Sequence, residues 1–408
     1  MDTPSGMSTV APARRFGVSR TALRRTVLSL VGAGARLAAK RAPGGVPARP
    51  RLLLIRPDHV GDVILTSPAV EVLRKALPEA YVAMMVGPWS REAARGDPLL
   101  DEVLVCPFPG FARAPKSSLL APYRLLWQTA ADLRAHRFDA ALVLRFDHWW
   151  GAWMAALARI PMRVGFATHE VSPFLTHALA PPAPTDHWTD RALAVTARLL
   201  EAWHLAVPRH PFPPPLRFQV TEDDEDEADR LFAAVGIEPD ASVVALHPGS
   251  GSPLKLWIEE RWVAVGRIMA DGGHRVVVTG SPHEATMAER IVVNIPGAAS
   301  LAGKTDLDAL AAVLRRCRLV VGCDSGALHL AVAVGVPTVH LFGPVDPAVY
   351  GPWGSPQRHR VVTGGLPGSP CGRLDLRTPD GSVAQCMAAI SVEQVLAACE
   401  AATAAANG

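Results

Sequence analysis

The stretch Gly-Cys-Asp-Ser-Gly-Ala-Leu-His-Leu-Ala, residues 322–331, directly follows an apolar run at residues 319–321. A short apolar run bounded by glycine is typical of a buried strand, and Ser325 and Gly326 begin a helix-like segment. The first N–H groups of a helix lack partners, and a glycine there permits close approach. The stretch therefore predicts an anion-binding helix start. The alternative is that Asp324 caps the helix and His329 packs inside the protein.

Strand-like and helix-like segments alternate along the chain from residue 51 onward. Strands are predicted at residues 51–56, 81–86, 140–144, 243–246, 275–278 and 319–321, and helices at residues 66–77, 259–270, 284–293, 306–315 and 392–402. This alternation is typical of parallel sheets with helices on both faces. The predicted fold class is therefore α/β, with ligands bound in the loops at the carboxyl ends of the strands.

The length of the chain and a proline-rich stretch predict two domains. A chain of 408 residues is too long for one ordinary core, and five prolines fall within residues 208–215. Thr221 is expected to cap a helix whose first turn holds the acidic run 222–227. The predicted parts are an N-terminal arm (1–50), a Rossmann-like domain (51–207), a stiff linker (208–221), a second Rossmann-like domain (222–390) and a C-terminal helix (391–408). The two Rossmann-like domains are expected to face each other across a cleft.

The composition argues against several classes of protein. A formal net charge of only +3 gives no reason to expect nucleic-acid binding. Cys106, Cys317 and Cys323 lie in or beside apolar runs, so they are predicted to be reduced core thiols of a cytoplasmic protein. No run reaches the roughly 18 to 20 consecutive apolar residues that a membrane-spanning helix needs.

Basic residues crowd the N-terminal arm. Ten arginines and lysines fall within residues 14–51, and no acidic residue lies between Asp2 and Asp58. One interpretation is a basic amphipathic helix that lies peripherally on the cytoplasmic face of the inner membrane. The other is an extension without fixed structure.

Two further loops that follow predicted strands carry polar groups. Residues 247–255 offer Ser250 and Gly251 as a flexible anion-binding turn, and Lys255 as a positive charge. Residues 279–284 end on Glu284, whose carboxylate could accept hydrogen bonds from ribose hydroxyls. The simpler alternatives are an ordinary loop for the first and an acidic residue in a helix first turn for the second.

The loop after the first predicted strand holds a candidate general base. Gly61 permits a tight turn, and Asp62 is expected to stand at the strand end and face the phosphate-binding half. Asp58 and His59 are rival candidates, and the alternative for Asp62 is a helix cap.

Residues 145–150 follow another predicted strand and contain Arg145 and Asp147. These two residues are candidates for the acceptor side of the cleft, although the segment could equally form an aromatic packing cluster.

Two well-known signatures are absent from the sequence. Residues 297–305 read GAASLAGKT, one residue too long for the phosphate-binding P-loop. The cysteines at 371, 386 and 399 form no CxxC pair, so no metal site is predicted.

Four segments, in this order, resemble the bacterial heptosyltransferase-like enzymes of glycosyltransferase family 9. They are IRPDHVGDVILTSPAV (55–70), HPGSGSPLKLW (247–257), TGSPHE (279–284) and GCDSGALHLAVAVGVPTVHLFGPVDP (322–347). The resemblance extends from residue 51 to about 402, and DHWTDR (186–191) adds to it. It implies a GT-B fold and an inverting, metal-independent sugar transfer, typically from ADP-heptose to the lipopolysaccharide core.

The resemblance also implies roles for individual residues. Asp62 would be the general base, and Lys255 would neutralise the diphosphate. Glu284 would bind the ribose, and Thr305 would lie near the adenine. The sugar diphosphate would be held by Asp324, Ser325, Gly326 and His329. His187 and Arg191, within the DHWTDR segment, join Arg145 and Asp147 as acceptor-side candidates.

One position departs from the family, because many members have an aspartate and a glutamine where this chain has Arg145-Phe146-Asp147. The expected partners are a nucleotide-sugar donor and a glycolipid or polysaccharide acceptor, with no cofactor. The alternatives are a transferase that uses a UDP- or GDP-hexose, an isomerase resembling the UDP-N-acetylglucosamine 2-epimerases, and a non-catalytic nucleotide-sugar-binding protein.

Overall fold

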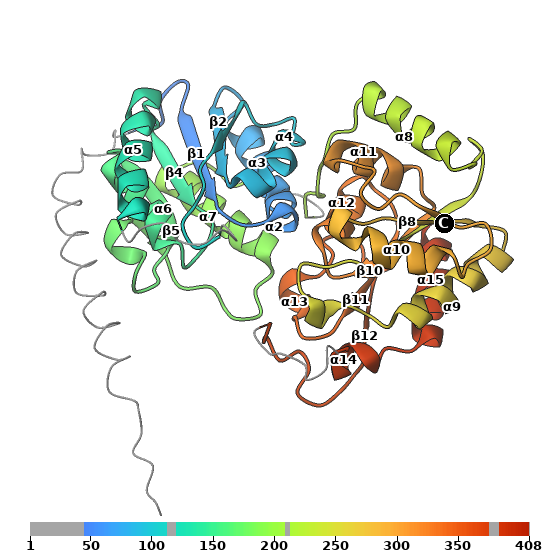
Figure 1. Cartoon of the computed structure of the whole chain (residues 1–408). Coiled ribbons are helices and arrows are strands. Elements are labelled where there is room, and N and C mark those ends of the chain that lie inside the picture. Colours follow the sequence, from blue (N-terminus) through green and yellow to red (C-terminus); the bar gives the residue numbers. More distant parts are fainter. Residues whose placement is uncertain (1–44, 112–119, 209–212, 375–382, 408) are drawn as a thin grey trace, which may run out of the picture.

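Two sheets of six parallel strands form the frame of the protein (Figure 1). The computed structural model describes residues 45–111, 120–208, 213–374 and 383–407. The first sheet contains β1 (Arg51–Arg56), β2 (Tyr81–Val86), β3 (Glu102–Val105), β4 (Ala140–Val143), β5 (Met162–Phe166) and β6 (His177–Leu179). The second contains β7 (Val243–His247), β8 (Arg275–Val278), β9 (Ala299–Ser300), β10 (Leu319–Cys323), β11 (Thr338–Phe342) and β12 (His359–Thr363).

Helices connect the strands and cover both sheets. In the first half they are α2 (Val60–Ile64), α3 (Ser67–Ala76), α4 (Arg91–Arg95), α5 (Ala121–His136), α6 (Trp149–Leu157) and α7 (Trp188–Ala202). In the second half they are α8 (Glu222–Ala234), α9 (Glu259–Asp271), α10 (Ala285–Val292), α11 (Leu307–Arg315), α12 (Gly326–Ala333), α13 (Pro347–Tyr350), α14 (Gln385–Ala388) and α15 (Val392–Asn407). Among the described residues, none of these helices combines the length and the apolar character needed to cross a membrane.

The two sheets share one strand order. The first runs β3-β2-β1-β4-β5-β6, and the second runs β9-β8-β7-β10-β11-β12 when read in the same sense. This is the order of the Rossmann fold, in which the chain reverses its direction of growth between the first and fourth strands. Ligands bind at that switch point, so the loops after β1, β4, β7 and β10 are where a site is expected.

The two halves are packed against each other. One continuous cluster of buried apolar side chains runs from Leu52 in β1 to Val320 in β10, while the outer face of each sheet has a cluster of its own. Short helix α2 lies against α12 where the halves meet (Figure 1). Helix α15 packs on the second sheet through Val395 and Cys399.

The predicted fold class is confirmed, and the helix predicted after Thr221 is present. The Thr221 hydroxyl accepts from the Asp224 N–H, and the Asp224 carboxylate accepts from the Thr221 N–H, which forms a capping box. Two details differ from the prediction. Asp62 lies inside the five-residue helix α2 rather than in a loop, and the helix expected at 284–293 is a 3-10 turn (Pro282–Glu284) followed by α10. The basic arm falls outside the described residues up to Gly44, and the domain boundaries stay a prediction.

Candidate functional site

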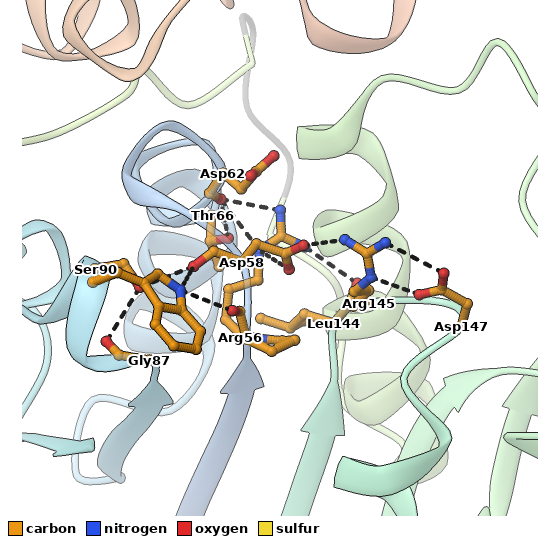
Figure 2. A network of polar contacts seen from close by, with 11 residues as sticks. Arg56, Asp58, Asp62, Thr66, Gly87, Ser90, Leu144, Arg145 and Asp147 are labelled. Atoms are coloured by element: carbon orange, nitrogen blue, oxygen red, sulfur yellow. Dashed lines mark hydrogen bonds and ion pairs between the residues drawn. The ribbon is translucent and has the colours of Figure 1, made fainter. Parts of the chain in front are cut away.

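Hydrogen bonds to its main-chain carbonyl hold Asp62 at the end of β1. Arg56 is the last residue of β1 and is fully buried, and its Nε and Nη2 donate to the Asp62 carbonyl at 3.2 and 3.0 Å (Figure 2). The Thr66 hydroxyl donates to the same carbonyl at 3.0 Å. Three hydrogen bonds therefore fix the main chain of Asp62, while its side chain is only partly buried.

A chain of ion pairs continues from Arg56 toward the loop after β4. The Asp58 carboxylate lies 3.4 Å from Arg56 Nε and also pairs with the Arg145 guanidinium. Arg145 Nε in turn lies 2.6 Å from Asp147 Oδ1, so the charges alternate across the switch point of the first sheet (Figure 2). The Asp58 carbonyl accepts from Trp89 Nε1 at 3.0 Å and from the Ser90 hydroxyl at 2.9 Å, which fixes this residue as well.

The two aspartates of this cluster have opposite pKa shifts. Burial opposes ionisation of Asp58, but the charges of Arg56 and Arg145 outweigh it and hold the pKa of this carboxyl below its ordinary value. Burial, together with the negative charge of Asp58, raises the pKa of Asp62 to about 6. Asp62 is thus the carboxyl group in this cluster whose pKa suits a general base near neutral pH.

The second switch point holds the helix start predicted from residues 322–331. Ser325 is the N-cap of α12, but its side chain makes no capping hydrogen bond, and its buried hydroxyl has no partner among the described residues. The Ser250 hydroxyl donates to the Asp324 carbonyl at 2.8 Å. Lys255 Nζ lies 2.7 Å from Asp324 Oδ2. Ser250, Lys255, Asp324 and Ser325 are therefore brought together, and Asp324 binds the lysine rather than capping the helix.

The starts of α2 and α12 are in direct contact. A Cβ atom built on Gly61 would lie 2.8 Å from Cδ2 of His329 and 3.2 Å from Cα of Gly326. His329 is buried, its Nδ1 has no partner among the described residues, and burial lowers the pKa of its imidazole to about 4. The residue before Asp62 therefore abuts the helix that begins at Gly326, so the two halves of the predicted site face each other.

The Glu284 carboxylate approaches the loop after β7. Its Oε2 accepts from the N–H and the hydroxyl of Ser281 at 2.7 and 2.8 Å. Its Oε1 lies only 2.0 Å from where a Cβ of Gly249 would stand, so the carboxylate in this position packs directly on the loop and a side chain there would have to displace it. The first-turn alternative accounts for the Ser281 contacts, yet the carboxylate also borders the predicted anion-binding loop.

The remaining donor-side candidates lie at the margin of this cluster. Gly251 is exposed, with no neighbouring atom within 4 Å of its would-be Cβ. Thr305 is partly buried and directly precedes Asp306, the cap of α11. Its loop meets the one that holds Glu284, because the Gly303 N–H donates to the Gly280 carbonyl at 2.8 Å.

His187 and Arg191 serve contacts within the protein. His187 caps α7, stacks on Trp353 and lies with Nε2 3.1 Å from the Gly351 carbonyl, so it joins the two halves. Arg191 is buried, with its guanidinium 4.9 Å from the ring of Trp188, and it donates to two backbone carbonyls. Arg191 nevertheless adjoins the acceptor-side loop, because its guanidinium lies 5.3 Å from the Phe146 ring and Arg145 lies over the same Trp188 ring at 5.8 Å. The acceptor-side roles of both residues stay a prediction.

Two residues of the site were missed by the sequence reasoning. The sequence suggested that Arg56 is only the polar end of a strand, because a short apolar run does not reveal whether the charged residue that ends it is buried. His148 is buried beside Arg145, neither ring nitrogen has a partner among the described residues, and burial lowers the pKa of its imidazole to about 4. The only available signal was its place after a strand end.

Asp62, a carboxylate with a raised pKa, thus follows a residue that touches the start of α12, and this helix start has no side-chain cap and a lysine nearby. This arrangement suits a reaction in which a hydroxyl loses a proton on one side while a phosphate-linked group leaves on the other. The family model of glycosyltransferase family 9 (heptosyltransferase) matches residues 126–373, which is more than half of the chain. The chain belongs to this family, as its motifs predicted, and is a glycosyltransferase.

Relatives and solved structures agree with the family. Lipopolysaccharide heptosyltransferase 2 of Salmonella typhimurium is 26% identical over 323 residues, which cover 77% of this chain and 89% of that protein. A family 9 glycosyl transferase from Veillonella parvula has a TM-score of 0.70 at 24% identity and covers 90% of this chain and 99% of that one. ADP-heptose lipopolysaccharide heptosyltransferase II of Escherichia coli has a TM-score of 0.68 at 22% identity, with 88% and 100% covered. The two structural likenesses establish the fold.

Proposed function

We propose that this chain transfers heptose from ADP-heptose to an acceptor of the lipopolysaccharide core, with inversion and without a metal ion. The observation that carries the proposal is the contact of Gly61 with the start of α12, which supports a site in which Asp62 faces the helix start that would bind the diphosphate. The names of the relatives support the sugar and the acceptor, since they are lipopolysaccharide heptosyltransferases. The reaction would take place at the cytoplasmic face of the inner membrane.

Asp62 would act as the general base. The acceptor hydroxyl gives its proton to the Asp62 carboxylate as its oxygen attacks the anomeric carbon, and the bond from that carbon to the diphosphate breaks on the opposite side. With a pKa raised to about 6, the carboxylate is ionised at neutral pH yet remains basic enough to take a proton. Attack from the side opposite the leaving group inverts the anomeric carbon.

The leaving diphosphate gathers negative charge, which the second half would offset. The first N–H groups of α12, which have no intrahelical partner, and the Ser325 hydroxyl, which has no partner among the described residues, would supply hydrogen bonds. Lys255 supplies a full charge, and the diphosphate would compete with Asp324 for it. Because burial keeps His329 neutral, its imidazole would serve as a hydrogen-bond partner rather than as a cation.

The other predicted residues would bind the ends of the two substrates. Glu284, Ser250, Gly251 and Thr305 lie along the loops at the carboxyl edge of the second sheet, where ribose and adenine would be held. Arg145 and Asp147 occupy the switch point of the first sheet, which is the acceptor side.

The decisive experiment compares Asp62→Asn with the wild-type chain. We expect transfer from ADP-heptose to fall at least about 100-fold, which is typical for loss of a general base, while ADP binding measured by calorimetry is unchanged. Asp132→Asn, an exposed carboxylate on α5, is the matched control and should retain activity. The anomeric configuration of the product, determined by NMR, and insensitivity to EDTA test inversion and metal independence. Near-normal turnover by Asp62→Asn would show that another group is the base.

A further inference from the structure

Helix α5 carries large apolar side chains on its solvent side. Leu120, just before the helix, is 68% exposed, and Tyr123 and Trp127 are 45% and 55% exposed. Their spacing of three and four residues places them on one face of the helix. We call these three residues the α5 apolar face. The buried side of the helix, which borders this face, packs into the first half through Leu126, Ala130 and Leu133.

The exposed charges on the same helix are mostly basic. Arg134 lies two turns after Trp127 on the same line of the helix and is exposed. Arg124, and Arg137 at the end of the helix, are exposed as well. Asp132 is the one acidic residue of α5, and at 100° per residue it lies well off the line of Trp127 and Arg134. An apolar stripe with tyrosine and tryptophan, flanked by arginines, matches the composition of a helix that rests on an anionic membrane surface.

The N-terminal arm joins the fold beside α5. Residues 1–44 hold eight basic residues and a single acidic one. The described part of the chain begins at Gly45, six residues before Arg51. Arg51 Nε donates to the His136 carbonyl at the end of α5 at 2.6 Å. Six residues span at most about 20 Å. The sequence that precedes Gly45 is therefore strongly basic, which adds to the positive charge of the arginines on α5 in favouring an anionic partner.

The α5 apolar face also adjoins the acceptor side. Trp150 Nε1 donates to the Pro122 carbonyl at 3.2 Å, and the Tyr123 ring lies edge-on to Trp153, with centroids 6.1 Å apart. Helix α6, which carries both tryptophans, begins directly after the loop that bears Arg145. The apolar face and the acceptor-side loop therefore belong to one packed corner of the first half, and Figure 1 shows α5 at its outer edge.

We infer that the α5 apolar face docks the enzyme on an anionic lipid bilayer, with Tyr123 and Trp127 at headgroup depth and the neighbouring arginines against lipid phosphates. The inference rests on the proposed function in one respect: a glycolipid acceptor anchored in the same bilayer would then present its sugar to the adjoining loop.

Binding of the full-length chain to vesicles tests this inference without any substrate. With phosphatidylcholine vesicles containing roughly one third phosphatidylglycerol, the wild-type chain should co-sediment, and it should bind pure phosphatidylcholine much more weakly. The double variant Tyr123→Ser/Trp127→Ser should lower the bound fraction about tenfold. Ile268→Ser is the matched control, because Ile268 is 49% exposed on α9 of the other half, and it should bind normally. Trp127→Phe should retain most of the binding.

Activity assays separate this inference from the proposed function. The double variant should transfer sugar normally to a lipid-free acceptor oligosaccharide and lose transfer to the same acceptor embedded in vesicles. Asp62→Asn should bind vesicles normally but transfer sugar to neither the lipid-free nor the vesicle-embedded acceptor. Equal vesicle binding by wild type and double variant would overturn the inference. So would a wild-type dimer that the double variant converts to a monomer, since a second copy would then cover this face.

Discussion

Gly61 and Gly326 touch through their backbones: a Cβ atom added to Gly326 would lie 3.1 Å from the Gly61 nitrogen, and one added to Gly61 would lie 3.2 Å from Cα of Gly326. Both residues lie next to the groups proposed for catalysis, because Gly61 precedes Asp62 and Gly326 opens α12. The two helix starts can approach this closely only because neither residue has a side chain.

Gly61→Ala should impair both donor binding and transfer. The new methyl group would meet the His329 ring and the backbone of Gly326, and the backbone cannot move aside as a flexible side chain can. Overpacking of this kind costs about 1–3 kcal/mol, measurable as a lower urea midpoint. Gly45→Ala, which also has open space around its Cβ position and lies outside the proposed site, is the control and should change neither stability nor activity. A fully active Gly61→Ala enzyme would show that the contact between the halves is not needed for catalysis.

Lys255→Ala should weaken ADP binding by roughly 10- to 100-fold, the range expected for loss of a charge-assisted contact. The variant also leaves the buried Asp324 carboxylate unpaired where the diphosphate would lie. Adding Asp324→Asn to Lys255→Ala should therefore restore part of the affinity, which calorimetry can measure as a double-mutant cycle. Strictly additive losses would mean that the two side chains act independently on the donor.

The pH dependence of kcat/KM should show an acidic limb near the pKa of Asp62. Since the base must be ionised, activity should rise as pH increases through about 6. Asp58→Asn should shift this limb to lower pH, because the charge of Asp58 adds to burial in raising the pKa of Asp62. Asp147→Asn should leave the limb in place. An Asp58→Asn profile that coincides with the wild-type profile would contradict this coupling.

Asp62 should also make the fold less stable at neutral pH. Its pKa of about 6 in the folded state exceeds the ordinary 3.8, so the folded state holds its proton longer than the unfolded state. The resulting stability is fully present below about pH 4 and is lost as pH rises through 6. Asp62→Asn should therefore raise the free energy of unfolding at pH 7.5 by on the order of 1–2 kcal/mol, with little change at pH 4. Urea titrations at the two pH values would check this difference.

The sequence predicted the central strands more fully than the edge strands. The bounds of β1, β2 and β8 agree with the predicted ranges, because continuous apolar runs that end in glycine, proline or threonine define buried parallel strands. In contrast, β3, β5, β6, β9, β11 and β12 were not predicted. Of these, β3, β6, β9 and β12 are edge strands and are partly exposed, so their sequences lack a clear apolar run. β5 and β11 are buried, but Arg163 and His340 interrupt their apolar runs.

The site was predicted as a set of loops but not as a set of contacts. Strand ends pointed to Asp62, Lys255 and Ser325, since the alternation of elements fixes which loops share an edge. The pairing of Lys255 with Asp324 and the burial of Arg56 depend on how segments distant in the sequence pack together. The local sequence around each residue does not determine that packing.

The three hydrogen bonds to the Asp62 carbonyl from Arg56 and Thr66 have a consequence for the catalytic cycle. An anchor at a strand terminus disfavours a flap-like swing of residues 58–62, so the main chain of Asp62 moves only with the whole first sheet. If the proposed function holds, entry of the nucleotide-sugar donor and release of the nucleotide should therefore need the two halves to move apart as rigid bodies, and this hinge motion rather than a local lid would set the rate of turnover.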